Sequence, residues 1–424
     1  MENIGMLLLL ACGGALTLRL RFVQFRRPFY ALRTLKNRSA DGVSPFEALA
    51  TSLGGCIGTG NIAGVAGAIL LGGPGALVWM WLSAIICAAS KYAEIYYAQR
   101  LGGSPMDYMA NGLPRFLRFF APLYAAVCLV ASLCMGNLVQ ANATAEAMQS
   151  VFTGESTRLV TGLCLAALTA LITFGGAKRV GRAAAFLVPC MSILYLLGAC
   201  VVIGINITAL PGAIQSIIEG AVRPRALTGG VAGFLTTFRV GMARGVFTHE
   251  AGMGTAALAH GAVRAKNPHT QALLGVFEVF FDTIVICSFT GLAILVSGVP
   301  LPYGNASVNG ALVIDAFAAA LGGKAAGLLI SAALSLFALT TVLSFSLFGT
   351  ICAERLFGQK ARLPFRLVFL ALLVIGALIS PAFAWRATEL LTLLMALVNG
   401  GALMVLSFSV LPWQRRREAT SAAS

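Results

Sequence analysis

The chain has 424 residues, of which 58% are hydrophobic and only 11% are charged. Soluble domains carry about 25% charged residues, so this composition excludes a protein built from water-soluble domains. The net charge of +15 does not indicate nucleic-acid binding here, because most Lys and Arg residues lie in short segments between long apolar runs. The ten cysteines form no CxxC pair and no Cys/His cluster, so neither a disulfide framework nor a zinc site is indicated.

Eleven apolar runs are each long enough to cross a bilayer, which takes about 20 residues of helix. The spans that we expect are roughly residues 3–20, 45–71, 74–98, 121–148, 158–174, 182–205, 230–262, 270–298, 325–351, 364–383 and 388–411. Breakers separate them, such as Gly72-Gly73-Pro74 between the second and third runs. The first run lacks a basic segment before it, so we expect a retained helix and not a cleaved signal peptide.

The distribution of positive charge predicts the orientation. If the segment after the first helix is cytoplasmic, 23 Lys and Arg residues fall in cytoplasmic segments and five fall in outside segments. Cytoplasmic loops of membrane proteins are enriched in Lys and Arg. We therefore expect a protein of the plasma (inner) membrane with its N-terminus outside and its C-terminus cytoplasmic. This count places Lys91 on the cytoplasmic side, and we expect Glu94 near the same end of the third helix.

Two of the expected spans contain glycine clusters that oppose a continuous helix. The second span carries one cluster between Gly54 and Gly64, and the seventh carries another between Gly241 and Thr255. Each glycine weakens a helix by about 0.8–1.0 kcal/mol relative to alanine. Unwound backbone in a membrane is tolerated only where it is buried in protein or lines a cavity. Broken helices at matching positions of inverted repeats indicate the binding site of a secondary transporter.

The spacing of the two breaks predicts the architecture. Five helices separate the start of one broken span from the start of the other, so the ten helices after the first divide into two groups of five. We expect an all-α polytopic membrane protein with one N-terminal helix and a five-plus-five inverted-repeat core. The expected divisions are an N-terminal helix and basic loop over 1–40, the first repeat over 41–206, an external connection over 207–229, the second repeat over 230–411 and a cytoplasmic tail over 412–424. Short amphipathic helices are expected over 211–222 and 309–322.

The broken helices also predict which chemistry the protein can bind. An interrupted helix exposes N–H groups, which suit a carboxylate, on one half and C=O groups, which suit a small cation, on the other. Asn61 and Thr59 add neutral oxygen ligands beside the first break, and hard cations prefer oxygen ligands. A zwitterionic amino acid together with Na⁺ matches this set of groups.

A series of motifs runs in order over nearly the whole chain. The most specific is Gly58-Thr59-Gly60-Asn61-Ile62-Ala63-Gly64-Val65-Ala66, followed by Gly72-Gly73-Pro74-Gly75-Ala76 and Trp79-Met80-Trp81. The others are Phe22-Val23-Gln24-Phe25-Arg26, Gly136-Asn137-Leu138-Val139-Gln140-Ala141-Asn142, Leu187-Val188-Pro189, Ala243-Arg244-Gly245-Val246-Phe247, Glu250-Ala251-Gly252 and Phe281-Asp282-Thr283. With these motifs the chain resembles the alanine or glycine:cation symporters, of the sodium:alanine symporter type.

This resemblance implies the five-plus-five fold of the amino-acid and neurotransmitter symporters. It also implies transport of small neutral amino acids, chiefly alanine and glycine, with Na⁺ as the coupling ion and no organic cofactor. The implied substrate site is formed by the amides of Gly58, Thr59 and Gly60 with Gln140, Phe247 and Thr248. The ligands of one implied Na⁺ are Asn61, the Cys56 carbonyl and Thr248, and those of a second are the carbonyls of Gly54, Ile57 and Phe337 and the hydroxyls of Thr340 and Thr341.

Three positions depart from the family pattern. The family usually has Asn at His249, Trp at Phe345 and Asp at Thr388. A histidine beside an unwound helix could titrate near neutral pH, so H⁺-coupled amino-acid symport is an alternative to Na⁺ coupling. The candidates for a gate or a proton-carrying group are Arg244, His249, Glu250 and Asp282, and we expect Arg244 to pair with one of the deep acids Glu250, Glu278 and Asp282.

Other function classes fit less well. An ion channel would share glycine-rich breaks, but a channel filter repeats across subunits and these two breaks differ in sequence. An enzyme is not indicated, since the HExxH zinc motif that His249-Glu250 could begin fails at Met253 and no nucleophile–base arrangement is found. We expect a small neutral amino acid and membrane lipid as partners and no nucleic acid. The sequence leaves the oligomeric state open.

Overall fold

The computed structural model describes residues 2–26, 28–36, 42–222, 230–304, 309–379 and 381–409, which form helices and turns and no strand. The α-helices are α1 (Glu2–Arg19), α2 (Pro45–Cys56), α3 (Ala63–Gly72), α4 (Ala76–Leu101), α5 (Pro105–Gly112), α6 (Phe120–Leu133), α7 (Val139–Gln149), α8 (Thr157–Thr173), α9 (Gly176–Ile205), α10 (Leu210–Val222), α11 (Gly230–His249), α12 (Thr255–His260), α13 (Pro268–Val279), α14 (Ser288–Val296), α15 (Asn309–Leu321), α16 (Gly323–Phe357), α17 (Arg362–Leu378) and α18 (Pro381–Ser409). Three shorter elements are the 3₁₀ helix η3 (Thr59–Asn61) and the π-helical turns η5 (Cys134–Leu138) and η7 (Phe280–Cys287). The expected tail over 412–424 and the end of the external connection, 223–229, lie outside the described residues.

Each of the eleven expected spans coincides with helix, so the all-α architecture is confirmed. Among the described residues, seven helical stretches are long and apolar enough to cross a membrane, and the bent pair α2–α3 would make an eighth. α1 and α8 are apolar but shorter. The number of membrane crossings therefore stays a prediction.

Three short helices connect the longer ones. α10 and α15 occupy the segments 211–222 and 309–322, which the sequence predicts as short helices. α5 was not expected. It begins at Ser104-Pro105, where Ser104 Oγ accepts the Asp107 N–H at 3.2 Å and proline occupies the first turn. The serine–proline pair is a helix start signal that could have been found in the sequence.

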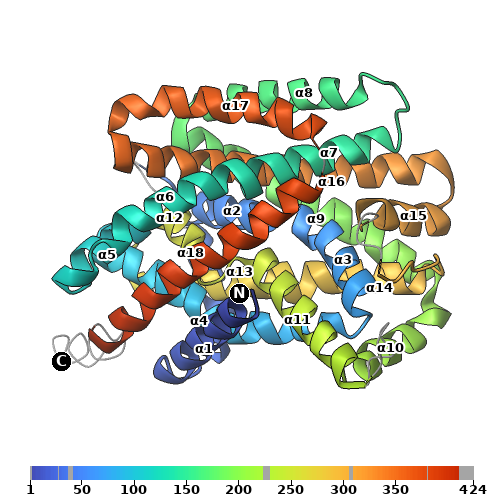
Figure 1. Ribbon diagram of the computed structural model, residues 1–424, viewed down its shortest axis with the longest axis horizontal. Helices are drawn as coiled ribbons and strands as arrows, with labels where there is room; N and C mark the ends of the chain where they lie inside the picture. Colours follow the sequence, from blue (N-terminus) through green and yellow to red (C-terminus); the bar gives the residue numbers. More distant parts are fainter. Residues whose placement is uncertain are drawn as a thin grey trace.

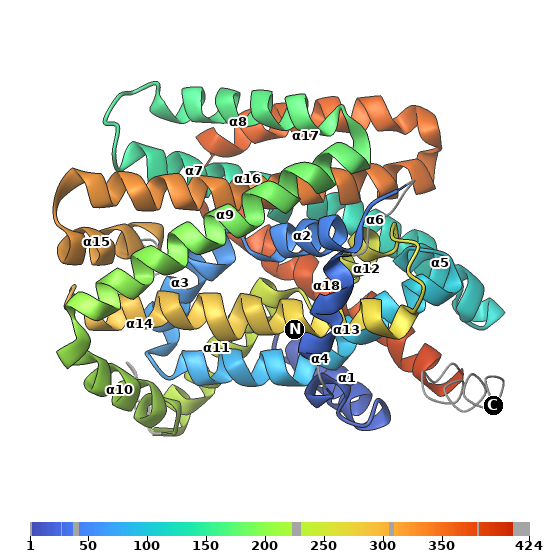
Figure 2. The same ribbon diagram turned by 180° about the vertical axis from the view of Figure 1, so that it is seen from behind.

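The helices form layers. In both views α8 and α17, which pack together, lie at one edge of the molecule, and α1 and α10 lie at the opposite edge (Figure 1, Figure 2). The interrupted helices α2–α3 and α11–α12 lie between these edges. Ion and substrate groups carried by the breaks are therefore in the interior of the protein.

α4 packs closely against α11 because α11 carries glycines at the contact. A Cβ at Gly245 would lie 2.1 Å from Ser83 Oγ, and a Cβ at Gly241 would lie 2.4 Å from the Ala76 carbonyl oxygen. Small residues let membrane helices approach each other in this way. Our expectation that Gly241 and Gly245 belong to the unwound stretch is therefore wrong, since both lie in continuous helix and serve packing.

The first broken helix is enclosed by protein. Every residue from 48 to 70 is buried. α2 ends at Cys56, α3 begins at Ala63 after the short η3, and the two helical parts are bent by 56°. Buried surroundings are the environment in which a membrane protein can keep unwound backbone. The predicted interruption of this helix is confirmed.

The second break comprises only the five residues between α11 and α12. Three of them have left-handed backbone, with φ of 52° at Glu250, 90° at Gly252 and 87° at Gly254. This conformation suits glycine and is uncommon for glutamate. At Gly254 a Cβ would also lie 2.4 Å from the Tyr124 hydroxyl oxygen, so only glycine fits there. The second predicted interruption is confirmed in this narrower range.

Candidate functional site

Asn61 organises the first break. Its Oδ1 accepts the Gly58 N–H at 3.0 Å, which closes the turn between α2 and α3. Its Nδ2 donates to Asp282 Oδ1 at 2.7 Å, so the break is tied to the π-helical turn η7. Asp282 Oδ2 accepts the Thr283 hydroxyl at 2.8 Å. Asp282 was expected as a gate or proton group, and the structure places its carboxylate beside Asn61.

The glycine backbone of the first break is closely walled. Thr59 N–H donates to Gln140 Oε1 at 3.3 Å. A Cβ at Gly58 would lie 2.5 Å from Thr341 Oγ1, and a Cβ at Gly60 would lie 2.9 Å from the Phe247 ring. The residues expected around the substrate carboxylate are thus brought together, on elements that are far apart in sequence. Within the described part of the chain, the buried Thr59 hydroxyl has no hydrogen-bond partner, and such a group is often met by a ligand or an ordered water.

The five atoms expected around the second cation also meet. The Thr341 hydroxyl donates toward the carbonyl oxygens of Gly54 at 3.0 Å, Phe337 at 3.2 Å and Ile57 at 3.5 Å. Thr340 Oγ1 donates to the same Phe337 oxygen at 2.9 Å. Three carbonyl oxygens and two hydroxyls therefore converge where the end of α2 meets α16, which is a neutral oxygen environment of the kind that hard cations bind.

Lys91 lies next to the expected site and not in a cytoplasmic segment. Its Nζ donates to Cys56 Sγ at 2.8 Å and to the His249 carbonyl oxygen at 2.9 Å, and it pairs with Glu278 Oε2 at 3.2 Å. Its side chain is 1% exposed. Our sequence-based placement of Lys91 is wrong, because one polar face of α4 turns inward against the two broken helices.

Glu94, one turn along α4 from Lys91, is buried as well, and its expected position near the membrane surface is also wrong. Its Oε2 accepts the Gly254 N–H at 2.6 Å and the Asn399 amide at 3.1 Å. Asn399 also donates to the Gly252 carbonyl oxygen at 2.9 Å. These bonds hold the unwound stretch between α11 and α12 in place.

His249 is hydrogen-bonded at both ring nitrogens. Nδ1 accepts the Ala251 N–H at 3.0 Å, and Nε2 lies 3.3 Å from Ser83 Oγ. Since the Ser83 hydroxyl donates to the Met80 carbonyl oxygen at 2.7 Å, Nε2 carries the proton and donates to Ser83. The neighbouring Glu250 accepts the Thr255 hydroxyl at 2.7 Å. This geometry fits a neutral His249 ring that caps the end of α11, and the expected role of His249 as a gate or proton group stays a prediction.

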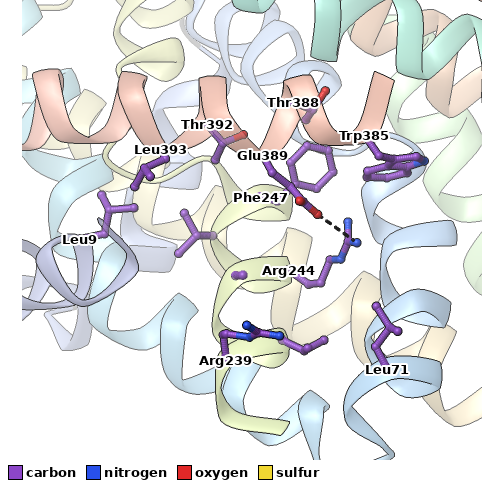
Figure 3. A pocket seen from close by; sticks show the side chains of 13 residues that line it. Leu9, Leu71, Arg239, Arg244, Phe247, Trp385, Thr388, Glu389, Thr392 and Leu393 are labelled. Carbon is purple, nitrogen blue, oxygen red and sulfur yellow. Dashed lines mark ion pairs between the residues drawn. The ribbon is translucent and has the colours of Figure 1, made fainter. Parts of the chain in front are cut away.

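A cavity of about 220 Å³ lies beside the second half of α11, and Figure 3 shows the side chains around it. Arg244 pairs with Glu389 of α18 at 3.4 Å, and its guanidinium lies 4.9 Å from the centre of the Trp385 ring. The expected pairing of Arg244 with a deep acid is wrong, because Arg244 lies on the face of α11 that is turned to α18. The remaining lining residues are Leu9, Leu71, Arg239, Val240, Ala243, Val246, Phe247, Thr388, Thr392 and Leu393.

Phe247 contacts both this cavity and the first break. Its ring lines the cavity and lies 5.6 Å from the Trp385 ring, centre to centre, and a Cβ at Gly60 would lie 2.9 Å from the same ring. Thr388 and Thr392 also line the cavity, and neither hydroxyl has a hydrogen-bond partner among the residues described. The remaining predicted site residue, Thr248, donates its hydroxyl to the Gly245 carbonyl oxygen at 2.8 Å.

Two contacts near the site were not predicted from the sequence, that of Lys91 with the end of α11 and that of Glu389 with Arg244. Lys91 lies seven residues inside the span expected over 74–98, roughly 10 Å of helix from its end. Charged residues at such depth usually face the interior and are functional, so the position itself carried a signal. Nothing in the sequence pairs Glu389 with Arg244, since that contact depends on how α18 packs.

Comparisons with known proteins agree with this geometry. The sequence profile of the sodium:alanine symporter family matches residues 1–419. The chain is 36% identical to the sodium/alanine symporter AgcS of Methanococcus maripaludis, over 95% of this chain and 91% of that protein. It is 34% identical to a protein of Bacillus subtilis named probable sodium/glutamine symporter GlnT, over 94% and 84%.

A solved structure supports the fold in the same way. The crystal structure of MhsT in complex with L-phenylalanine matches with a TM-score of 0.64 and 15% identity, covering 86% of this chain and 89% of that one. The five-plus-five architecture with two broken helices is thus shared with a solved protein, although the sequences have diverged. The chain belongs to the sodium:alanine symporter family, and it is a membrane transporter and not an enzyme.

Proposed function

We propose that this protein is a Na⁺-coupled symporter that moves a small neutral amino acid, alanine or glycine, by alternating access. The observation that carries the proposal is the convergence of the Gly54, Ile57 and Phe337 carbonyl oxygens on the Thr341 hydroxyl. A Na⁺ bound there would tie the end of α2 to α16, so that ion binding and the arrangement of the first break depend on each other. Neutral oxygen ligands at a helix break are the type of cation site found in secondary transporters.

The other expected ion ligands come from both breaks. Asn61 and the carbonyl of Cys56 lie on the first broken helix, and Thr248 lies on the second. We add the Asp282 carboxylate, 2.7 Å from the Asn61 amide, as the group that balances the charge of this ion. An ion held by these residues would depend on both broken helices being in place.

The proposed substrate site is the backbone of Gly58, Thr59 and Gly60. Its amides would hold the carboxylate of the amino acid, and the unpartnered Thr59 hydroxyl would add a polar contact. Gln140 and Phe247 wall this backbone closely, which favours a side chain of a hydrogen atom or a methyl group. The relative named for alanine supports the same substrate, and the relative named for glutamine makes glutamine the competitor to test.

We propose that the outer gate consists of the Arg244–Glu389 ion pair and the Phe247 and Trp385 rings (Figure 3). Removing Lys91 from the cytoplasmic charge count leaves the asymmetry of that count intact, so we keep the orientation with the N-terminus outside. In this orientation α11, which is the first half of the seventh expected span, and the start of α18 lie in the outer half of the membrane. The cavity would then be the outer entrance, and Phe247 would separate it from the substrate.

The test is uptake of labelled alanine and glycine by the purified protein in proteoliposomes. An imposed inward Na⁺ gradient should drive accumulation above the external concentration, and an H⁺ gradient without Na⁺ should not. Accumulation driven by H⁺ alone would establish the alternative, H⁺-coupled symport. Uptake that only equilibrates under either gradient would refute coupled transport and favour a channel. Competition by unlabelled glutamine tests the substrate range.

A further inference from the structure

Lys91 brings three separate elements together at one buried nitrogen. The three N–H groups of its ammonium match three acceptors, which are Cys56 Sγ, the His249 carbonyl oxygen and Glu278 Oε2. Cys56 is the last residue of α2, and His249 is the last residue of α11. The two helix ends also approach each other directly, with the Cys56 thiol 3.7 Å from the His249 carbonyl oxygen.

This position has a specific electrostatic meaning. The C-terminal end of a helix carries partial negative charge and favours a nearby cation. Here one ammonium group binds the last residues of both interrupted helices, through the backbone carbonyl of His249 and the side-chain sulfur of Cys56. An ion pair between Lys91 and Glu278 would by itself need no further partner. Lys91 also donates two hydrogen bonds to the last residues of α2 and α11.

The partner of Lys91 is itself held firmly. Glu278 Oε2 accepts the Ser52 hydroxyl at 2.7 Å, and Glu278 Oε1 lies 2.5 Å from His260 Nε2. His260 Nδ1 is in turn 2.7 Å from the Gln271 amide nitrogen. The network therefore joins α2, α4, α12 and α13 through side chains that are all buried.

We propose that the Lys91 ammonium is a tethered cation that sets the spacing of the two broken helices, so that Lys91 and Glu278 are positioning residues for the ion and substrate site. This inference rests on the proposed function, Na⁺-coupled symport. Cys56 is itself an expected cation ligand through its carbonyl, and Thr248 directly precedes His249. If Lys91 and Glu278 no longer hold these two residues, the expected ligands Cys56 and Thr248 should therefore move as well.

The decisive variant replaces both charges by neutral side chains of similar size, Lys91→Met together with Glu278→Gln. Neutralising a buried pair in this way often leaves a protein folded. The Na⁺ concentration for half-maximal alanine uptake should rise about tenfold, as expected when a residue that orients metal ligands is lost. The melting temperature in detergent should stay close to that of the wild type. A wild-type Na⁺ curve in the folded double variant would overturn the proposal.

A matched control removes an ion pair elsewhere. Arg362 and Glu354 pair near the protein surface, away from both breaks, so Arg362→Met with Glu354→Gln should keep the wild-type Na⁺ curve. If this control shifts the Na⁺ curve as much as the test variant does, the effect is not specific to Lys91 and Glu278, and the proposal fails.

A second variant covers the case in which the double variant does not fold. Ser52→Ala removes one hydrogen bond to Glu278 without changing any charge, and it should shift the Na⁺ curve in the same direction by about two- to threefold. An unchanged curve would overturn the proposal. Wild-type uptake that ignores Na⁺ would instead refute the proposed function, and the positioning role would then be measured as the alanine concentration for half-maximal uptake, which the same variants should raise.

Discussion

The two helix breaks differ in their chemistry although they occupy matching positions in the two repeats. The first is walled mainly by neutral groups, namely the glycine backbone, Gln140 Oε1, the Thr341 hydroxyl and the Asn61 amide. Its charged neighbours contact it at its two ends, Lys91 at Cys56 and Asp282 at Asn61. The second is surrounded by ionisable side chains, with Lys91 at the end of α11 and Glu94 bound to Gly254. The backbone is interrupted in both places, but the neighbours give each break a different task.

The difference suits two separate tasks in a symporter, binding and releasing the ion and substrate at one break and holding the backbone geometry at the other. A site that must release its ion and substrate in each cycle can be built mainly from neutral dipoles, and the Asp282 carboxylate beside Asn61 would balance the charge of the ion. A helix break that must keep its geometry can be held by buried ion pairs, because losing one partner of such a pair strongly destabilises the protein.

Gly58→Ala should have the largest effect, because the new Cβ would lie 2.5 Å from Thr341 Oγ1 and displace it from the three carbonyl oxygens. Overpacking of about 1–3 kcal/mol corresponds to a loss of roughly five- to 150-fold, read as Na⁺-dependent alanine uptake per protein in the membrane. Gly64→Ala is the matched control on the same broken helix, since its new Cβ would meet no described atom within 4 Å apart from its chain neighbours and the backbone of its own helix. Equal uptake by the two variants would contradict the crowding of the first break.

Thr340→Ala with Thr341→Ala should raise the Na⁺ concentration for half-maximal transport about tenfold, since two oxygen ligands worth about 1 kcal/mol each or slightly less are removed. Maximal uptake at saturating Na⁺ should recover. Thr350→Ala serves as control, because this buried hydroxyl only donates to the Ser346 carbonyl oxygen further along α16. An unaltered Na⁺ curve in the double variant would remove the site between α2 and α16.

Glu389→Gln should have a moderate effect that is confined to the substrate. The Glu389 side chain is 46% exposed, and such ion pairs contribute about 0.2–1 kcal/mol. The alanine concentration for half-maximal uptake should therefore change by up to about fivefold, and the Na⁺ curve should not change. A shift of the Na⁺ curve would place Glu389 at the ion site and not at the outer gate.

His249→Asn should have the smallest effect. An asparagine can accept the Ala251 N–H as the ring nitrogen does, so uptake should stay within about twofold of the wild type. The sequence alone predicts a flatter pH profile for this variant. The hydrogen bonds at both ring nitrogens predict instead that the profile keeps its shape, and a flattened profile would restore the proton-carrying role of His249.

The fold and the first break could be predicted from the sequence because their signals are local. Hydropathy shows the long helices, and the glycine cluster from Gly54 to Gly64 marks the first interruption together with Asn61 inside it. The pairing of Gly54 and Ile57 with Thr341 followed only from the resemblance to a family, since nothing local connects residues nearly 300 positions apart in the chain.

The remaining contacts could not be predicted because they depend on tertiary packing. Glycines that unwind a helix and glycines that let two helices touch look alike in sequence, which is why Gly241 and Gly245 were assigned to the wrong role. Lys91 was misplaced because the side of a helix that a charge faces is decided by its neighbours. His249 shows the same limit, since its role depends on Ser83 on another helix.

α1 belongs to neither repeat, yet it packs on α4 of the first repeat and on α18 of the second. It also supplies Leu9 to the wall of the cavity. Any rocking of one repeat against the other must slide at least one of these contacts. α1 therefore connects the two repeats that would move against each other during alternating access. A chemical cross-link from α1 to α18 should stop transport without changing the ion or substrate site.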